Sequence, residues 1–200
     1  MKIKLRGPLT AALLLLAASL AAGAANASII EYDFVLNGLN ESPPTASAGT
    51  GNGFVLIDDL AHTLLISVSF SGLSGTTTAS HIHCCTAIAG TGNAGVATEV
   101  PTFGGFPLGV SSGTYMNLYD LTRLASYNPL FVTGQGGTAA SAEAALLAGI
   151  AGGNTYLNIH SSVNPSGEIR GTLVRVPEPA SLGLLALGLL GAGLRRRRSA

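Results

Sequence analysis

Apolar and polar residues alternate along the middle of the chain, and this pattern predicts β-strands. The clearest segment is 64–70, where Leu64, Ile66, Val68 and Phe70 stand at every second position. Because side chains on a strand point alternately to its two faces, one face of such a segment belongs in a core. Similar or shorter apolar segments predict strands at 32–36, 54–57, 80–85, 114–119, 155–160 and 168–174.

Glycine-rich segments separate several of these strands, at 72–75, 90–95, 104–109 and 134–137. Short strands at this spacing are typical of antiparallel sandwiches or barrels, so we predict an all-β fold. The exception is segment 139–147, which is rich in alanine, is followed by Gly149 and predicts one short helix.

The amino-terminal end has the features of a signal peptide. Three basic residues precede an apolar run at 9–22, and Ala25-Asn26-Ala27 follows as a small-residue cleavage site. This order is typical of a secretory signal over residues 1–27, cut by signal peptidase between Ala27 and Ser28. The remainder of the chain is therefore expected in an exported, oxidising environment.

The carboxy-terminal end carries a second hydrophobic segment. Pro177, Glu178 and Pro179 precede an apolar stretch at 180–194, and four arginines follow at 195–198. As a helix, that stretch reaches about 22 Å, which is short of a bilayer core of about 30 Å. The arginines should stay cytoplasmic under the positive-inside rule, which places the middle of the chain outside the inner membrane.

The complete tail, VPEPASLGLLALGLLGAGLRRRR, resembles the PEP-CTERM sorting signal of exported bacterial proteins in all three of its parts. The resemblance implies that an exosortase recognises residues 176–200 and cuts near Pro177, Glu178 and Pro179. The short transmembrane segment would then anchor the protein in the inner membrane only transiently, before it reaches the cell surface or the medium. Such signals are found in species that make extracellular polysaccharide.

The segment between the two ends is acidic. Residues 28–176 contain three arginines, no lysine and nine acidic residues, so the difference is a net charge near −6. This charge excludes a nucleic-acid partner, because no basic patch is present to neutralise phosphates. The segment also lacks a P-loop lysine, so a nucleotide-binding protein is not indicated.

Three segments of the middle resemble successive signatures of the CHRD domain: LNGLNESPPTASAGTG, VSFSGLSGTTTASHIH and YLNIHSSVNPSGEIRGTL. The resemblance extends from Phe34 to Val174, and we assign residues 28–175 to this domain. It implies an antiparallel, immunoglobulin-like β-sandwich and leaves the biochemical activity open. Many family members have glycine directly after His-x-His, where this chain has Cys84-Cys85, so the resemblance does not explain the cysteines.

Three histidines are candidates for a metal site. His81 and His83 are two apart on a predicted strand and therefore share a face, with Ile82 on the other. His160 lies on a separate strand, on the face opposite the apolar Leu157 and Ile159. Three imidazoles from two strands could bind copper or zinc. Alternatively, they are half-exposed polar residues whose rings hydrogen-bond loop carbonyls or carboxylates.

The two cysteines leave three options open. Cys84 and Cys85 are adjacent, and no other cysteine is present in the sequence. They could form a vicinal disulfide, remain as free or metal-bound thiols, or pair with another molecule. Glu168 and Arg170, two apart on one strand, are expected to pair with each other or with a neighbouring strand.

The sequence thus predicts an exported, non-enzymatic protein of the bacterial cell surface or the extracellular polysaccharide matrix. Its expected partners are signal peptidase and exosortase during export, followed by exopolysaccharide or surface proteins. Two alternatives are a copper- or zinc-binding or redox protein that uses His81, His83 and His160, and an adhesion module that binds a protein partner.

Overall fold

The computed structural model describes residues 29–177 of the chain. The predicted signal peptide with its Ala27–Ser28 cleavage site lies outside the described residues, as do Glu178, Pro179 and the rest of the sorting tail. The described strands are β1 (Ile29–Asn37), β2 (Thr50–Asp58), β3 (Thr63–Ser71), β4 (Thr77–Cys84), β5 (Gly113–Asp120), β6 (Thr155–Ser161), β7 (Ile169–Thr172) and β8 (Val174–Arg175). The helical elements are η1 (Gly38–Asn40), η2 (Leu124–Ser126), α2 (Pro129–Gly134) and α3 (Ala139–Ala151).

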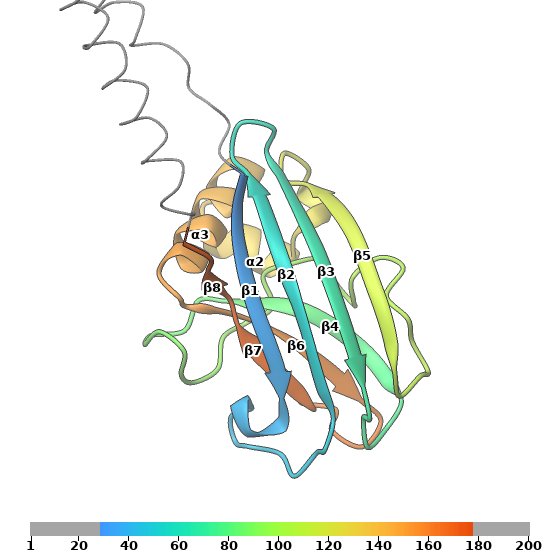
Figure 1. Ribbon diagram of the computed structural model, residues 1–200. Coiled ribbons are helices and arrows are strands. Elements are labelled where there is room, and N and C mark those ends of the chain that lie inside the picture. Colours follow the sequence, from blue (N-terminus) through green and yellow to red (C-terminus); the bar gives the residue numbers. More distant parts are fainter. Residues whose placement is uncertain (1–28, 178–200) are drawn as a thin grey trace, which may run out of the picture.

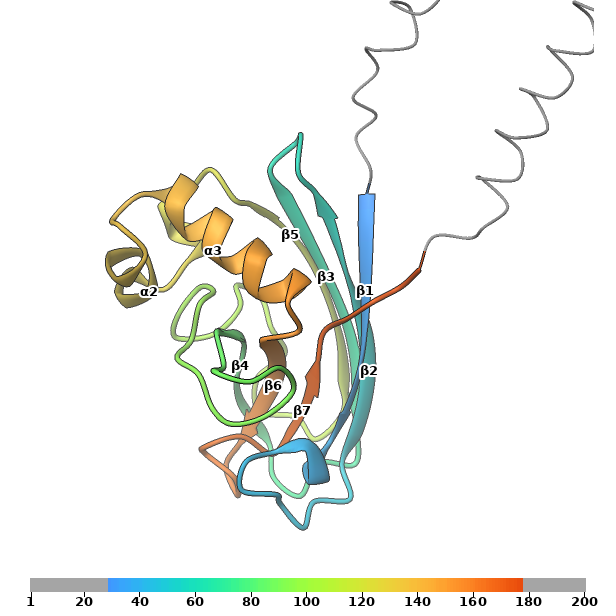
Figure 2. The same ribbon diagram turned by 90° about the vertical axis from the view of Figure 1, so that its left-hand side faces the viewer.

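The strands form one antiparallel sheet in the order β4-β6-β7-β1-β2-β3-β5, and β8 pairs with β1. The sheet curls, so that β4, β6 and β7 face the layer of β1, β2, β3 and β5 (Figures 1 and 2). Figure 2 shows α3 over one end of the space between the two halves. The prediction of an all-β, sandwich-like fold is confirmed.

The residues that the alternating pattern predicted to face the core are buried in the structure. Leu64, Ile66, Val68 and Phe70 of β3 are all buried. The strands β1, β2 and β5 contribute further core residues from the same layer, and the opposing half contributes Ile82, Leu157, Ile159 and Ile169. The core therefore lies inside the curl, and the other face of β4, β6 and β7 is free to carry polar side chains.

Helix α3 is longer than predicted. Thr138 and Ser141 form a capping box at its start, and Ala142, Leu146 and Ile150 are buried. The prediction that the helix ends near Gly149 was wrong, because helical hydrogen bonding continues to Gly152, whose N–H donates to the Ala148 carbonyl. Gly149 is instead required by close packing, since a Cβ there would lie 2.5 Å from the sulfurs of Cys84 and Cys85.

Candidate metal centre

The histidines share one face of the sheet because β4 and β6 are neighbours in a fixed register. His81 lies opposite Asn158, His83 opposite Tyr156, and His160 opposite Ala79. Ile82, Leu157 and Ile159 occupy the other face, in the core. The predicted side-chain directions were therefore correct. What the sequence left open was whether the two strands pair, and they do so directly.

The loop between β4 and β5 covers this face (Figure 2). It runs along the free edge of β4, where Cys84 donates to Gly95, Ala97 donates to Ile82, and Phe103 donates to Ser80 through backbone hydrogen bonds. As a result, His81 and His83 are only 6% and 8% exposed, and only His160 is half-buried.

A backbone carbonyl fixes the proton on each imidazole. Pro101 O lies 2.7 Å from His81 Nε2, Ala94 O lies 2.8 Å from His83 Nδ1, and Pro165 O lies 2.9 Å from His160 Nδ1. A carbonyl oxygen can only accept, so each of these nitrogens donates. The lone pairs consequently sit on Nδ1 of His81 and on Nε2 of His83 and His160.

These lone pairs are brought together. One ring nitrogen from each of the three histidines lies within 4.8 Å of the other two, and His81 Nδ1 is 3.4 Å from His160 Nε2. Two nitrogens bound tetrahedrally to one zinc ion, at about 2.0–2.1 Å each, would lie about 3.3 Å apart. Because both nitrogens are acceptors, neither donates to the other. A cation between them would satisfy both.

His83 Nε2 is a buried acceptor without a hydrogen-bond partner among the residues that the structure describes. Buried polar atoms nearly always have a partner, so an orphaned acceptor beside two other free lone pairs is the donor set expected of a metal site.

Burial keeps the three imidazoles neutral. Desolvation lowers the pKa of His81 to about 4, although the Pro101 carbonyl opposes this change. Desolvation also lowers the pKa of His83 and the pKa of His160. At neutral pH each imidazole therefore carries a single proton, and its other nitrogen can bind a metal without first releasing a proton.

The neighbours of the histidines hold them in place. The His83 ring stacks on Tyr156 at a centroid distance of 4.8 Å, and the Arg170 guanidinium lies 4.3 Å from the centre of the Tyr156 ring. Arg170 donates to the carbonyls of Asn40 and Gly92 and lies 3.8 Å from a carboxylate oxygen of Glu41.

Of the two alternatives predicted for Glu168 and Arg170, pairing with each other does not occur, whereas Glu168 contacts Ser161 of the neighbouring strand β6. Arg170 pairs with Glu41, whereas Glu168 accepts hydrogen bonds from Ser47, Ser74, Gly75 and Ser161. The carboxylate of Glu168 is thus surrounded by neutral donors and needs no arginine.

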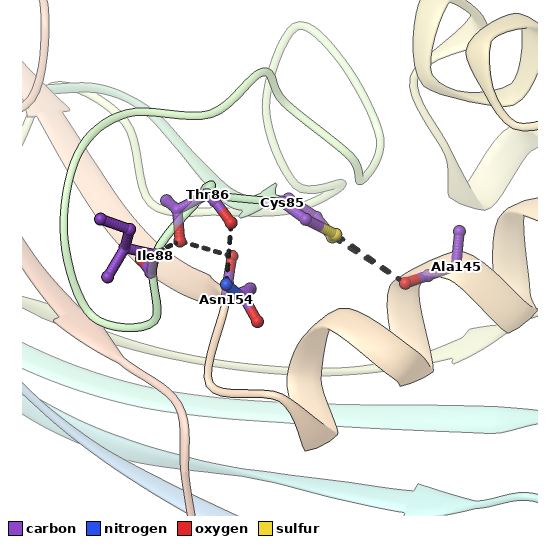
Figure 3. The surroundings of a disulfide bond; sticks show 6 residues. Cys85, Thr86, Ile88, Ala145 and Asn154 are labelled. Atoms are coloured by element: carbon purple, nitrogen blue, oxygen red, sulfur yellow. Dashed lines mark hydrogen bonds between the residues drawn. A yellow bond between two sulfur atoms is a disulfide. The ribbon is translucent and has the colours of Figure 1, made fainter.

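Cys84 and Cys85 form a disulfide, one of the three options that the sequence left open. Figure 3 shows Cys85 directed toward the Ala145 carbonyl of α3, at 3.9 Å from its sulfur. Cys84 belongs to the core, on the side of β4 opposite the histidines. The cysteines are therefore a packing element between β4 and α3 and stand apart from the histidine cluster.

Sequence reasoning did not identify Glu41 as part of this region. Glu41 follows η1 and is 7% exposed. Burial raises the pKa of Glu41 to about 7, even though Arg170 lowers it. The only signal in the sequence was a lone acidic residue before the Ser42-Pro43-Pro44 turn, and such a residue is usually solvated.

The fold and the site together define an all-β domain with a three-histidine cluster on the outer face of one half of its sheet. Residues 32–173 match the family model of the CHRD domain, and the chain belongs to this family. Residues 175–198 match the PEP-CTERM protein-sorting motif. No curated protein and no solved structure is significantly similar to the chain.

The sorting motif supports the prediction of an exported protein that is processed by an exosortase. Within residues 29–177, no helix has both the length and the apolar character that crossing a membrane requires. Transient anchoring in the inner membrane stays a prediction, because the tail lies outside the described residues.

Proposed function

We propose that this protein is an exported metal-binding protein that holds one Zn²⁺ or Cu²⁺ ion through His81, His83 and His160. The observation that carries the proposal is the convergence of three imidazole rings, each of which donates its N–H to a backbone carbonyl. Second ring nitrogens that donate to carbonyls are the usual support of histidine ligands.

The donor set narrows the choice of metal. Imidazole suits zinc and copper, whereas calcium and magnesium require several oxygen ligands. Among residues 29–177 no cysteine or carboxylate belongs to the cluster. The ligand set is therefore built on nitrogen, with one coordination position left for a further group.

We further infer that the domain acts at the cell surface or in the extracellular polysaccharide matrix, without catalysing a reaction. The sorting motif and the net negative charge of the exported segment support this location. Cell fractionation with an antibody against the domain tests it. Recovery in the surface or matrix fraction is expected, and retention in the inner membrane after tail processing would contradict the location.

The metal proposal is tested on the exported domain stripped of metal and then titrated with Zn²⁺ or Cu²⁺ by calorimetry. We expect one ion per chain with a Kd below about 1 μM, which corresponds to about −8 kcal/mol. The double variant His81→Ala/His83→Ala should lose at least a hundredfold in affinity.

His62→Ala is the matched control, because His62 lies outside the cluster and its ring pairs with Glu143 of α3. This variant should bind like the wild type. Equal metal content in the wild type and the double variant would reject the proposal.

A further inference from the structure

A second orphaned atom lies beside the histidines. Asn158 stands directly opposite His81 in the β4–β6 register and two residues before His160 on the same face of β6. Its side chain is 2% exposed, and its Oδ1 has no hydrogen-bond partner among the described residues. Side chains directly opposite on antiparallel strands have Cβ atoms about 5 Å apart, so Asn158 is an immediate neighbour of the cluster.

Glu41 and the Asn158 amide border the same glycine. A Cβ at Gly167 would lie 2.6 Å from Glu41 Oε1 and 2.8 Å from Asn158 Nδ2, and Glu41 Oε1 has no hydrogen-bond partner among the described residues. The carboxylate attracts the amide N–H₂ group and repels the amide oxygen. With Nδ2 turned to Glu41, Oδ1 is on the other side of the amide.

Arg170 pairs with the carboxylate of Glu41. The other oxygen of Glu41 lies 3.8 Å from Arg170 Nε, and three further acceptors hold Arg170: the carbonyls of Asn40 and Gly92 and the side-chain oxygen of Asn93. Asn158 stands between Glu41 and the histidines, because it borders Gly167 together with Glu41 and lies opposite His81 in the strand register. The row of neighbouring side chains from Arg170 through Glu41 to Asn158 therefore ends at the histidines.

We propose that Asn158 Oδ1 is the fourth ligand of the metal bound by His81, His83 and His160. This inference rests on the proposed function and adds the residue that sets metal selectivity. Four acceptors would then share one cation, which removes both the orphaned His83 Nε2 and the orphaned Asn158 Oδ1. A neutral oxygen beside three imidazoles favours the divalent ions Zn²⁺ and Cu²⁺ over Cu⁺, which prefers soft sulfur ligands.

Three substitutions at this position test the ligand role through affinity. Asn158→Leu keeps the shape and removes the oxygen, so Zn²⁺ and Cu²⁺ should bind about 10- to 100-fold more weakly. Asn158→Asp keeps the shape and adds charge, so both ions should bind at least tenfold more tightly. Asn158→Met supplies a thioether, so the Cu⁺ affinity should rise relative to Cu²⁺.

Asn117→Leu is the matched control, because Asn117 lies on β5 in the opposite half of the sheet and is not part of the cluster. Affinities are measured by competition with a chelator of known strength, and circular dichroism reports whether each variant is folded. The control should bind both divalent ions like the wild type.

A measurement on the unaltered protein covers the case in which Asn158→Leu does not fold. In protein labelled with ¹³C at asparagine, Zn²⁺ should shift the carboxamide carbon of Asn158 and leave that of Asn117 in place. An unmoved Asn158 signal in zinc-loaded protein would overturn the inference. So would wild-type affinities, within threefold, in all three Asn158 variants.

These results separate the two proposals. A wild-type protein that binds neither ion removes the proposed function itself. A wild-type protein that binds metal, with affinity that depends on the histidines but not on position 158, removes only the role of Asn158.

Discussion

Two buried polar clusters, one around Glu168 and one around Asn158 and the histidines, differ in whether their acceptors have donors. Around Glu168, serine hydroxyls and backbone N–H groups all point at the carboxylate. Around Asn158 and the histidines, His83 Nε2, Asn158 Oδ1 and the nearby Glu41 Oε1 have no hydrogen-bond partner within residues 29–177. The first cluster is complete within the described residues, whereas the second contains acceptors that a cation would satisfy.

The comparison of the two clusters distinguishes polar groups with a structural role from polar groups that are free to bind a ligand. A satisfied buried network stabilises one arrangement of the chain, and an unsatisfied one costs free energy unless a ligand is added. The pKa values agree with this distinction. Burial raises the pKa of Glu168, but hydrogen bonds from Ser161, Ser47 and Ser74 outweigh it and bring the pKa to about 2. Burial dominates at Glu41 and raises its pKa to about 7.

The largest expected effect on folding is that of Glu168→Gln. The pKa of Glu168 falls from its ordinary value of 4.5 to about 2, so its ionised form stabilises the fold by about 3 kcal/mol near neutral pH. This contribution is present above pH 4.5 and is lost as the pH falls through 2. Urea denaturation should show the variant less stable by this amount at pH 7, with a smaller difference at pH 3. Equal stabilities at pH 7 would contradict the assignment.

Metal should compensate the unsatisfied cluster and leave the satisfied one unchanged. At a free metal concentration 100 times the Kd, binding stabilises the folded state by about 2.7 kcal/mol. We expect this gain in the wild type and in Glu168→Gln, and none in His83→Ala, when unfolding is followed with and without Zn²⁺. A gain in His83→Ala equal to that of the wild type would place the metal elsewhere.

Glu41→Gln should differ from Glu168→Gln in size and in pH dependence. Because the folded pKa of Glu41 is raised to about 7, ionisation of Glu41 destabilises the fold as the pH rises from 4.5 through 7. The metal-free variant should therefore be within about 1 kcal/mol of the wild type, and its relative stability should increase toward pH 8. A loss at pH 8 as large as that of Glu168→Gln would show that the Arg170 pair outweighs burial.

The smallest effect is expected for His62→Gln, which breaks the pair between exposed His62 and buried Glu143, outside both clusters. The hydrogen bond that His62 Nδ1 donates to the Glu143 carboxylate raises the pKa of His62, so its contribution is present below pH 6.5 and is lost as the pH rises through the higher folded value. The variant should be slightly less stable than the wild type at pH 5.5 and equal to it at pH 9. A stability difference between the variant and the wild type that grows toward pH 9 would contradict a raised pKa for His62.

Local patterns in the sequence predicted most of the fold. The alternation from Leu64 to Phe70 identified β3, and the alanine-rich segment identified α3. β2 begins at Thr50, earlier than predicted, because Gly51 and Gly53 hide the strand pattern. A Cβ at Gly51 would lie 2.7 Å from the Ser69 carbonyl, so close packing within the sheet explains a glycine that resembled a loop signal. Helix α2, with its Asn128 cap, was not predicted because it is only six residues long.

The site was predictable only in part. Spacing alone put His81 and His83 on one face, and the same reasoning put His160 with Asn158. Their convergence depends on the pairing of β4 with β6, which no local pattern encodes, and on its register. Of the two proposed uses of the histidines, the hydrogen bonding of their rings to loop carbonyls is confirmed, whereas metal binding stays a prediction. His81 and His83 are, however, buried rather than half-exposed.

The pairing of β4 with β6 also fixes when the site can exist. It joins Thr77–Cys84 to Thr155–Ser161, segments separated by about half of the domain, and contacts of such long sequence separation form slowly during folding. The histidines remain apart until that pairing is complete. Metal binding by this protein would therefore report the pairing of β4 with β6, and the rate of metal loading would measure the rate of that folding step.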